Sequence, residues 1–185
     1  MLEDVVGGGT IARADLRKAL FDGHPLDELP PYCIAGRDEN GGWHIIKTAK
    51  VLEAVEAAGK VIKVAKNHLF AIGDFVTAGG KFDGASDKIT AIDKSNAAYD
   101  SITLAAAIGA MAEDMVLVAV KAKADAGSAE ATVETSEVAI TMAKVDLTVA
   151  NQSCGLMVRG TIEEQNMPFP LDADLKKLMP LIRFV

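Results

Sequence analysis

The sequence predicts a mainly β protein: a small antiparallel β-barrel or sandwich with short helices and extended terminal arms. Between residues 60 and 123, short apolar segments follow one another at nearly regular spacing. The breaks between them are rich in Gly, Asn, Asp and Ser and are too short for helices of normal length. Many short strands with frequent turn signals are typical of barrels and sandwiches. The strand candidates are 60–66, 71–78, 87–93, 101–107 and 115–123.

Residues 1–36 are expected to form an N-terminal arm with a short helix. The run "VVGGG" (5–9) has the composition of a flexible hinge. After it, residues 10–25 have roughly helical spacing of apolar residues, with Thr10 able to cap the first turn and Gly23 and Pro25 able to end the helix. Three prolines between residues 24 and 32 then predict an extended segment.

Residues 37–123 are expected to form the β-barrel body. The "DENGG" run at 38–42 contains an Asn-Gly pair and predicts a hairpin, followed by a strand at 43–47. Residues 49–60 fit a helix face and a strand alternation equally, so we expect a helix or irregular structure there. The residues expected in the barrel core or in an oligomer interface are Phe70, Phe75, Phe82, Ile89, Ile92, Tyr99, Ile102 and Leu104.

Residues 124–185 are expected to contain a linker, further strands and a C-terminal anchoring segment. The composition of 124–139 shifts to Ala, Ser, Thr and Glu, as in a linker, and strands are predicted at 138–152 and 155–162. Near the end, Asp172 can cap a short helix that Pro180 ends. The apolar tail at 181–185 is expected to dock, because a free apolar tail would associate non-specifically.

Composition excludes several classes of protein. The formal net charge is −7 and the basic residues form no stripe, which argues against nucleic-acid binding. Without an uncharged apolar run of roughly 18 residues, we expect no membrane span, and the acidic start is unlike a signal peptide. Cys33 and Cys154 lack metal or disulfide-framework spacing and are expected to be buried thiols made in a reducing cytoplasm.

No motif for chemistry stands out, so we predict no catalytic, cofactor-binding or metal-ligating residues and no enzymatic activity. The three histidines lie outside any HxH or HExxH pattern, and no phosphate-binding loop or GxSxG is present. Most aspartates fall at turns, where their side chains bond nearby backbone amides. The one enzymatic alternative pairs His68 with Asp74, but nothing in the sequence orients either residue.

Two stretches resemble a known group of proteins. "IKVAKNHLFAIGDFVT", followed by "ITAIDKSNAAYDSITL" and "DMVLV", resembles the small β-barrel of tailed-phage head-fibre or capsid-decoration proteins. The ending "GTIEEQNMPFPLDADLKKLMPLIRFV" is similar to the chain ends of head-fibre-like proteins from phages and prophages of gut Bacteroidetes. The resemblance implies a non-enzymatic virion protein, made in the host cytoplasm. It also implies a homotrimer bound to the major capsid protein on the outside of the head, where it stabilises the head or aids attachment to the host surface.

If the resemblance holds, the C-terminal segment is the expected site of attachment. The residues predicted to anchor it are Pro168, Phe169, Pro170, Leu178, Ile182 and Phe184. The alternative function is a carbohydrate- or receptor-binding β-module, in which Tyr32, Trp43 and His44 would form a ring-stacking patch. Aromatic residues make up only 5% of the chain, which disfavours this alternative because sugar platforms use several exposed rings.

Overall fold

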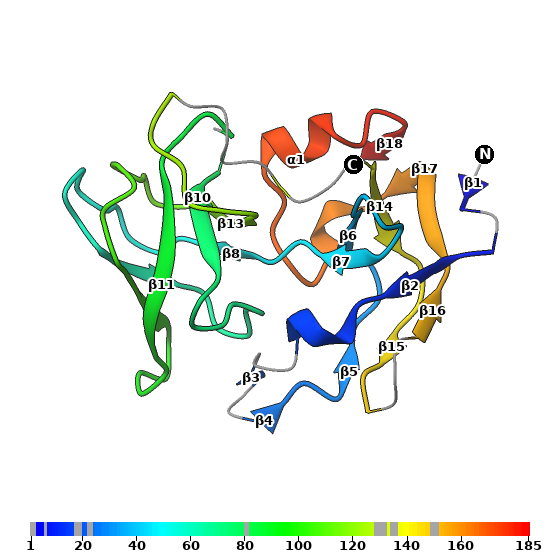
Figure 1. The fold of residues 1–185 in the computed structure, drawn as a ribbon, viewed down its shortest axis with the longest axis horizontal. Coiled ribbons are helices and arrows are strands. Elements are labelled where there is room, and N and C mark those ends of the chain that lie inside the picture. Colours follow the sequence, from blue (N-terminus) through cyan, green and yellow to red (C-terminus); the bar gives the residue numbers. More distant parts are fainter. Residues whose placement is uncertain are drawn as a thin grey trace.

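The strands of the chain form two curled sheets that lie side by side, with the C-terminal segment between them (Figure 1). This is a computed structural model, and it describes residues 3–5, 7–16, 20–21, 24–79, 82–127, 133, 137–148 and 152–185. The mainly β class predicted from the sequence is confirmed. The sheet on the left of Figure 1 comes from the middle of the chain, and the sheet on the right from its two ends.

The middle of the chain forms a small antiparallel barrel, which we call the middle barrel. The first and last strands of its sheet meet and close the barrel. Val51 forms a β-bridge with Val64, the Leu52 N–H donates to the Lys63 carbonyl oxygen, and the Ala65 N–H donates to the Lys50 carbonyl oxygen, both at 2.9 Å. All five strands predicted between 60 and 123 are present. In sheet order the strands are β8 (Thr48–Lys50), β13 (Val116–Val120), β10 (Phe75–Ala78), β11 (Ser86–Asp93), β12 (Asp100–Leu104) and β9 (Val61–Val64).

The core of the middle barrel is aliphatic, with Phe70 as its largest side chain. The prediction of the core residues is partly confirmed. Phe70, Ile89, Ile102 and Leu104 are buried in this core, and Ile92 is partly buried against it. Phe75 and Tyr99 are only half-buried, and Phe82 packs on a different core. Strand alternation explains the buried residues, since Asp100, Ile102 and Leu104 face inward along β12.

Both ends of the chain build a second curled sheet, which we call the terminal barrel. Strand β16 is at one end of its strand order, and β17 lies next to the other end, where only β1 follows it. Because β16 and β17 are consecutive in the chain and separated only by Gly155, the sheet closes on itself. Segments 1–36 and 124–185 therefore share one sheet. The strand predicted at 43–47 also lies in this sheet, and the expected 37–123 body is wrong at its start. The strands are β1 (Glu3–Asp4), β2 (Gly9–Ile11), β6 (Ile34–Arg37), β7 (Trp43–Ile45), β14 (Glu137–Thr141), β16 (Gln152–Cys154) and β17 (Leu156–Ile162).

Smaller elements complete the terminal barrel. Two short pairs flank it, β3 (Leu20–Phe21) with β4 (His24–Pro25) and β5 (Glu28–Leu29) with β15 (Val145–Asp146). The predicted 38–42 turn is confirmed, with the Gly42 N–H donating to Asp38 Oδ1 at 2.7 Å. A linker was expected at 124–139. Within it, Val133 is buried and strand β14 already begins at Glu137, while residues 128–132 and 134–136 lie outside the described residues.

The N-terminal helix prediction is wrong. Thr10 lies in β2 and pairs with Ser153, and only a single 3-10 turn, η1 (Arg13–Leu16), follows. Pairing with a neighbouring strand outweighs the weak local helical spacing here. Residues 17–19, 22 and 23 lie outside the described residues.

Gly8 and Gly9 have a packing role in place of the predicted hinge, whereas a Cβ at Gly7 would meet no atom within 4 Å; Val6 is outside the described residues. A Cβ at Gly9 would lie 2.3 Å from Leu156 Cδ1 and 2.5 Å from Trp43 Cδ1. At Gly8, where φ is +69°, a Cβ would lie 2.6 Å from the Cys154 carbonyl oxygen. Glycine therefore lets the N-terminal strand approach the β16–β17 strand closely.

The C-terminal segment consists of η2 (Glu164–Asn166), α1 (Ala173–Lys177) and β18 (Ile182–Phe184). As predicted, Asp172 caps the helix, and its carboxylate accepts from the Asp174 N–H at 2.9 Å. The apolar tail docks as predicted, because β18 pairs parallel to β17.

Residues 49–60, for which a helix or irregular structure was predicted, contain no helix. Beyond the end of β8 they are irregular, with a bridge between Val55 and Met111.

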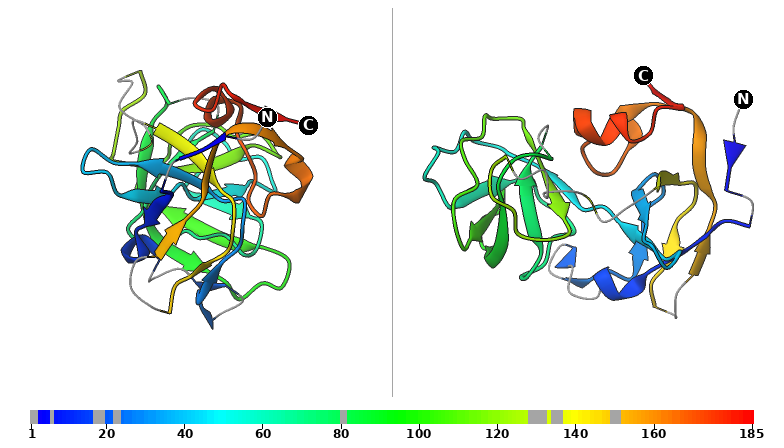
Figure 2. Two further views of the ribbon diagram at one scale, coloured as in Figure 1. Left: turned by 90° about the vertical axis from the view of Figure 1, so that its right-hand side faces the viewer. Right: turned by 45° about the horizontal axis from the view of Figure 1, so that its top comes forward.

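A third apolar core joins the two barrels, and we call it the shared core. The C-terminal segment contributes its centre, and Figure 2 shows from a second direction that this segment lies over the junction. Its buried members are Ile34, Ile46, Ile140, Met157 and Ile162 from the terminal side, Val118 from the middle barrel, Val133, and Leu171, Leu175, Met179 and Ile182 from the C-terminal segment.

Candidate functional site

The six predicted anchor residues divide between the interior and the surface. Phe169 and Ile182 are 7% and 6% exposed and pack inside this chain, and Phe184 is half-buried below the Lys176 ammonium group. Pro170 is half-buried, and its carbonyl oxygen accepts from Thr48 Oγ1 at 2.7 Å. Pro168 and Leu178 are exposed. Much of the predicted anchor is thus attached to its own barrels.

The same segment presents large aliphatic side chains to solvent. Leu178, Leu181 and Val185 are 41%, 60% and 57% exposed, and we call them the C-terminal apolar surface. Sequence reasoning missed Leu181 and Val185, although strand alternation around the buried Ile182 was a signal that could have placed them on the outside. Because β18 is hydrogen-bonded to β17, this surface is held in a fixed position.

The ring-stacking patch of the alternative function is not formed. Trp43 is 3% exposed and lies in the core of the terminal barrel. His44 points the other way along β7, as alternation requires, and its Nε2 lies 3.1 Å from Asp38 Oδ2. Tyr32 alone of the three is an exposed ring, 40% accessible, with φ at +66°. The prediction of a shared platform for these three residues is therefore wrong.

His68 and Asp74 do not meet as the enzymatic alternative requires. Asp74 Oδ2 accepts from the Lys47 Nζ at 2.7 Å and from the Ala71 N–H at 2.9 Å. Lys47 and Asp74 lie on the wall of a cavity of about 420 Å³ between the barrels, whereas His68 contacts Asp100. The aspartate that lies six residues after His68 thus neutralises a buried lysine.

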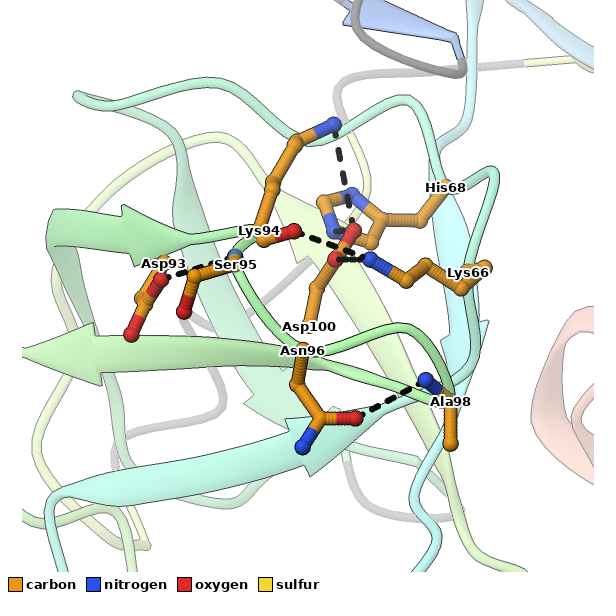
Figure 3. Close-up of polar contacts among 8 residues, drawn as sticks. All are labelled: Lys66, His68, Asp93, Lys94, Ser95, Asn96, Ala98 and Asp100. Atoms are coloured by element: carbon orange, nitrogen blue, oxygen red, sulfur yellow. Dashed lines mark hydrogen bonds and ion pairs between the residues drawn. The ribbon is translucent and has the colours of Figure 1, made fainter.

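A buried polar cluster gathers around Asp100 at the start of β12 (Figure 3). The Asp100 side chain is 1% exposed. Lys66 Nζ lies 2.7 Å from its Oδ1, while Lys94 Nζ and His68 Nε2 lie 3.8 and 3.2 Å from its Oδ2. Lys66 and His68 follow β9, and Lys94 begins the turn between β11 and β12, so two separate segments converge on the carboxylate of a third.

His68 is a neutral imidazole near pH 7. The Phe70 N–H donates to its Nδ1 at 3.2 Å, so the neutral ring carries its proton on Nε2, next to Asp100. Burial lowers the pKa of His68 to about 4, with Lys94 and Lys66 also lowering it and Asp100 raising it. The ring is 1% exposed, so a substrate cannot reach it without displacing packed atoms, and the arrangement fits a structural role.

This burial predicts a pH dependence of stability. Unfolded chains bind a proton at histidine below about pH 6.5, whereas folded His68 binds one only below about pH 4. Protonation therefore favours the unfolded state as pH falls from about 6.5 to about 4, and this site contributes roughly 3 kcal/mol to the loss. We expect urea unfolding across this window to show a smaller loss of the free energy of unfolding in His68→Gln than in wild type. Equal losses in the two proteins would contradict this role.

The two cysteines are buried free thiols, as expected. Burial raises the pKa of Cys33 to about 12, and its Sγ lies 3.1 Å from the Pro30 carbonyl oxygen. A thiol with so high a pKa is a poor nucleophile. Cys33 is therefore a poor candidate for nucleophilic chemistry.

Comparisons with known proteins identify no relative: no family model, curated protein or solved structure matches the chain. Among the residues in the ranges given above, no group of three His, Cys, Asp or Glu side chains could hold a metal ion. None of the helices that the structure describes combines the length and apolarity required to cross a bilayer.

Proposed function

We propose that this chain is a non-enzymatic phage virion protein that binds the outside of the head, as a decoration or head-fibre protein. It binds the major capsid protein as a homotrimer, through the C-terminal apolar surface. The observation that carries the proposal is the exposure of Leu178, Leu181 and Val185 on a segment that is itself fixed between two barrels. The resemblance of the chain ending to head-fibre-like proteins supports the choice of partner.

The energetics of this surface favour a binding role. Fully burying an exposed leucine side chain contributes about 1.5–3 kcal/mol. Leu181 and Val185 flank β18, whose pairing with β17 holds them in place before binding. A preformed surface loses less conformational entropy on binding than a free tail. The C-terminal segment can thus serve two roles, joining the barrels with its inner side chains and contacting the capsid with its outer ones.

The two alternative functions have less support. A carbohydrate-binding module would need several exposed rings side by side, but Trp43 is buried and Tyr32 is the one exposed ring of the three predicted residues. An enzyme that uses His68 with Asp74 would need the two side chains in contact, but they contact different partners and the His68 ring is enclosed. A scaffold of two barrels with a fixed apolar surface fits attachment to a larger assembly.

Saturation binding to empty heads of the encoding phage, assembled without this chain, tests the proposal. We expect Leu181→Asp to weaken binding by about tenfold or more, because a carboxylate would have to be desolvated in the contact. Ile72→Asp is the matched control: Ile72 is 57% exposed on the middle barrel, against 60% for Leu181, and this change should leave binding unaltered. Equal binding by wild type and Leu181→Asp would overturn the proposed contact. A strict monomer in sedimentation at high concentration would contradict the trimer.

A further inference from the structure

A polar cavity opens beside the Asp100 cluster on the middle barrel, in a position unrelated to the C-terminal apolar surface. It has a volume of about 360 Å³ and is lined by Lys66, Asn67, Lys94, Ser95, Asn96, Ala97 and Asp100. The Lys66 and Lys94 side chains are 29% and 25% exposed, so they are partly accessible from this cavity. The cavity therefore has two cationic groups in its wall and one carboxylate at its base.

The Lys66 ammonium in this wall has more N–H groups than the acceptors that contact it. The Lys66 ammonium has three N–H groups, and it contacts Asp100 Oδ1 at 2.7 Å and the Lys94 carbonyl oxygen at 3.1 Å. His68 Nε2 is buried without an aligned hydrogen bond, although Asp100 Oδ2 is 3.2 Å away. Asp100 is thus shared among two ammonium groups and an imidazole N–H. An acceptor-rich ligand in the cavity would accept from the third N–H group of Lys66, whose side chain is partly accessible.

The β11–β12 turn contributes Ser95, Asn96 and Ala97 to the same wall. Ser95 N–H donates to Asp93 Oδ1 at 2.9 Å, and Ala98 N–H donates to Asn96 Oδ1 at 2.8 Å. Within the described ranges, the intervening N–H groups of Asn96 and Ala97 have no intramolecular acceptor. Successive backbone N–H groups in a turn form concavities that bind anions. Figure 3 shows the Asp93 carboxylate directed at Ser95 and away from the two lysines.

We infer that this cavity binds a small oxyanion, of the phosphate or sulfate class, between the Lys66 and Lys94 ammonium groups and the N–H groups of the turn. The anion accepts from the Lys66 ammonium and from the N–H groups of the turn beside the positive charge of Lys94, and Asp100 keeps the two lysines in place when the cavity is empty. Burial and the two ammonium groups keep His68 uncharged, so the lysines carry the positive charge of the site.

Titration of the full chain with sodium phosphate or sulfate, followed by amide chemical shifts, tests the inference. At matched ionic strength, we expect saturable shifts centred on the amides of Asn96 and Ala97 with either oxyanion and none with chloride. Lys94→Gln should weaken binding by about tenfold or more, because hydrogen bonds to charged groups are the strong ones. Lys144→Gln removes a lysine of the terminal barrel that pairs with Glu28, and this control should bind as wild type does.

Two results would overturn the inference. The first is a wild-type response that is linear in anion concentration or is reproduced by chloride, because that is ionic screening and not a site. The second is an equal loss of affinity in Lys94→Gln and Lys144→Gln, which would trace binding to net charge. Neither result bears on capsid binding, which involves a different surface.

Discussion

Replacing Leu175 with alanine is expected to lower the free energy of unfolding by about 2–5 kcal/mol. Leu175 is fully buried on α1, at the point where the C-terminal segment meets both barrels in the shared core. Removing its side chain leaves a cavity bordered by residues from three parts of the chain, which cannot all relax to fill it. Urea unfolding of the purified variant, followed by circular dichroism, measures this loss.

Leu178→Ala is the matched control for that change. It removes the same side chain three residues later, at the C-cap of the same helix, where Leu178 is 41% exposed. We expect a loss within about 0.5 kcal/mol, because little apolar area leaves water at this position when the chain folds. Similar losses for the two variants would show that α1 does not join the barrels in the way the structure describes.

Gly9→Ala is expected to destabilise the chain by about 1–3 kcal/mol or more. Its Cβ would lie 2.3 Å from Leu156 Cδ1 and 2.6 Å from Trp43 Nε1, and both side chains are enclosed in the core of the terminal barrel. Either β2 must move away from β7 and β17 or these side chains must leave their packed positions. Fluorescence of Trp43, the only tryptophan in the chain, reports this change directly during urea unfolding.

Gly155→Ala provides the comparison for Gly9. Gly155 lies between β16 and β17, and the nearest atom to its added Cβ is Met142 Sδ at 3.6 Å, an ordinary contact distance. We expect a change within about 0.5 kcal/mol. If Gly9→Ala were tolerated as well as Gly155→Ala, the glycines near the N-terminus would be a flexible hinge after all.

The strands of the middle barrel could be predicted because the features that define them, turn residues and apolar alternation, lie close together along the chain. The five strands between 60 and 123 are bounded by Gly, Asn and Asp at turns, and alternation placed Ile89, Ile102 and Leu104 inside. Asp172 was likewise identifiable as a cap, since its hydrogen bond to Asp174 spans only two residues. Such features depend on neighbours along the chain.

The terminal barrel could not be predicted in the same way, because its pairings join distant residues. Thr10 pairs with Ser153, and Glu137 pairs with Arg37, so the strand at 9–11 becomes evident only when the other end of the chain is in place. The same holds for His68, whose partner Asp100 lies on a strand that is far along the chain. The burial of Trp43 follows from the closure of this barrel and is not visible in local composition.

Cryo-electron microscopy of empty heads, with and without added wild-type chain, tests the proposed function most directly. The account predicts extra density on the outer surface of the head, three copies together, with the residues from Leu178 to Val185 facing the major capsid protein. No added density at saturating chain, or density only on the inner surface, would contradict it.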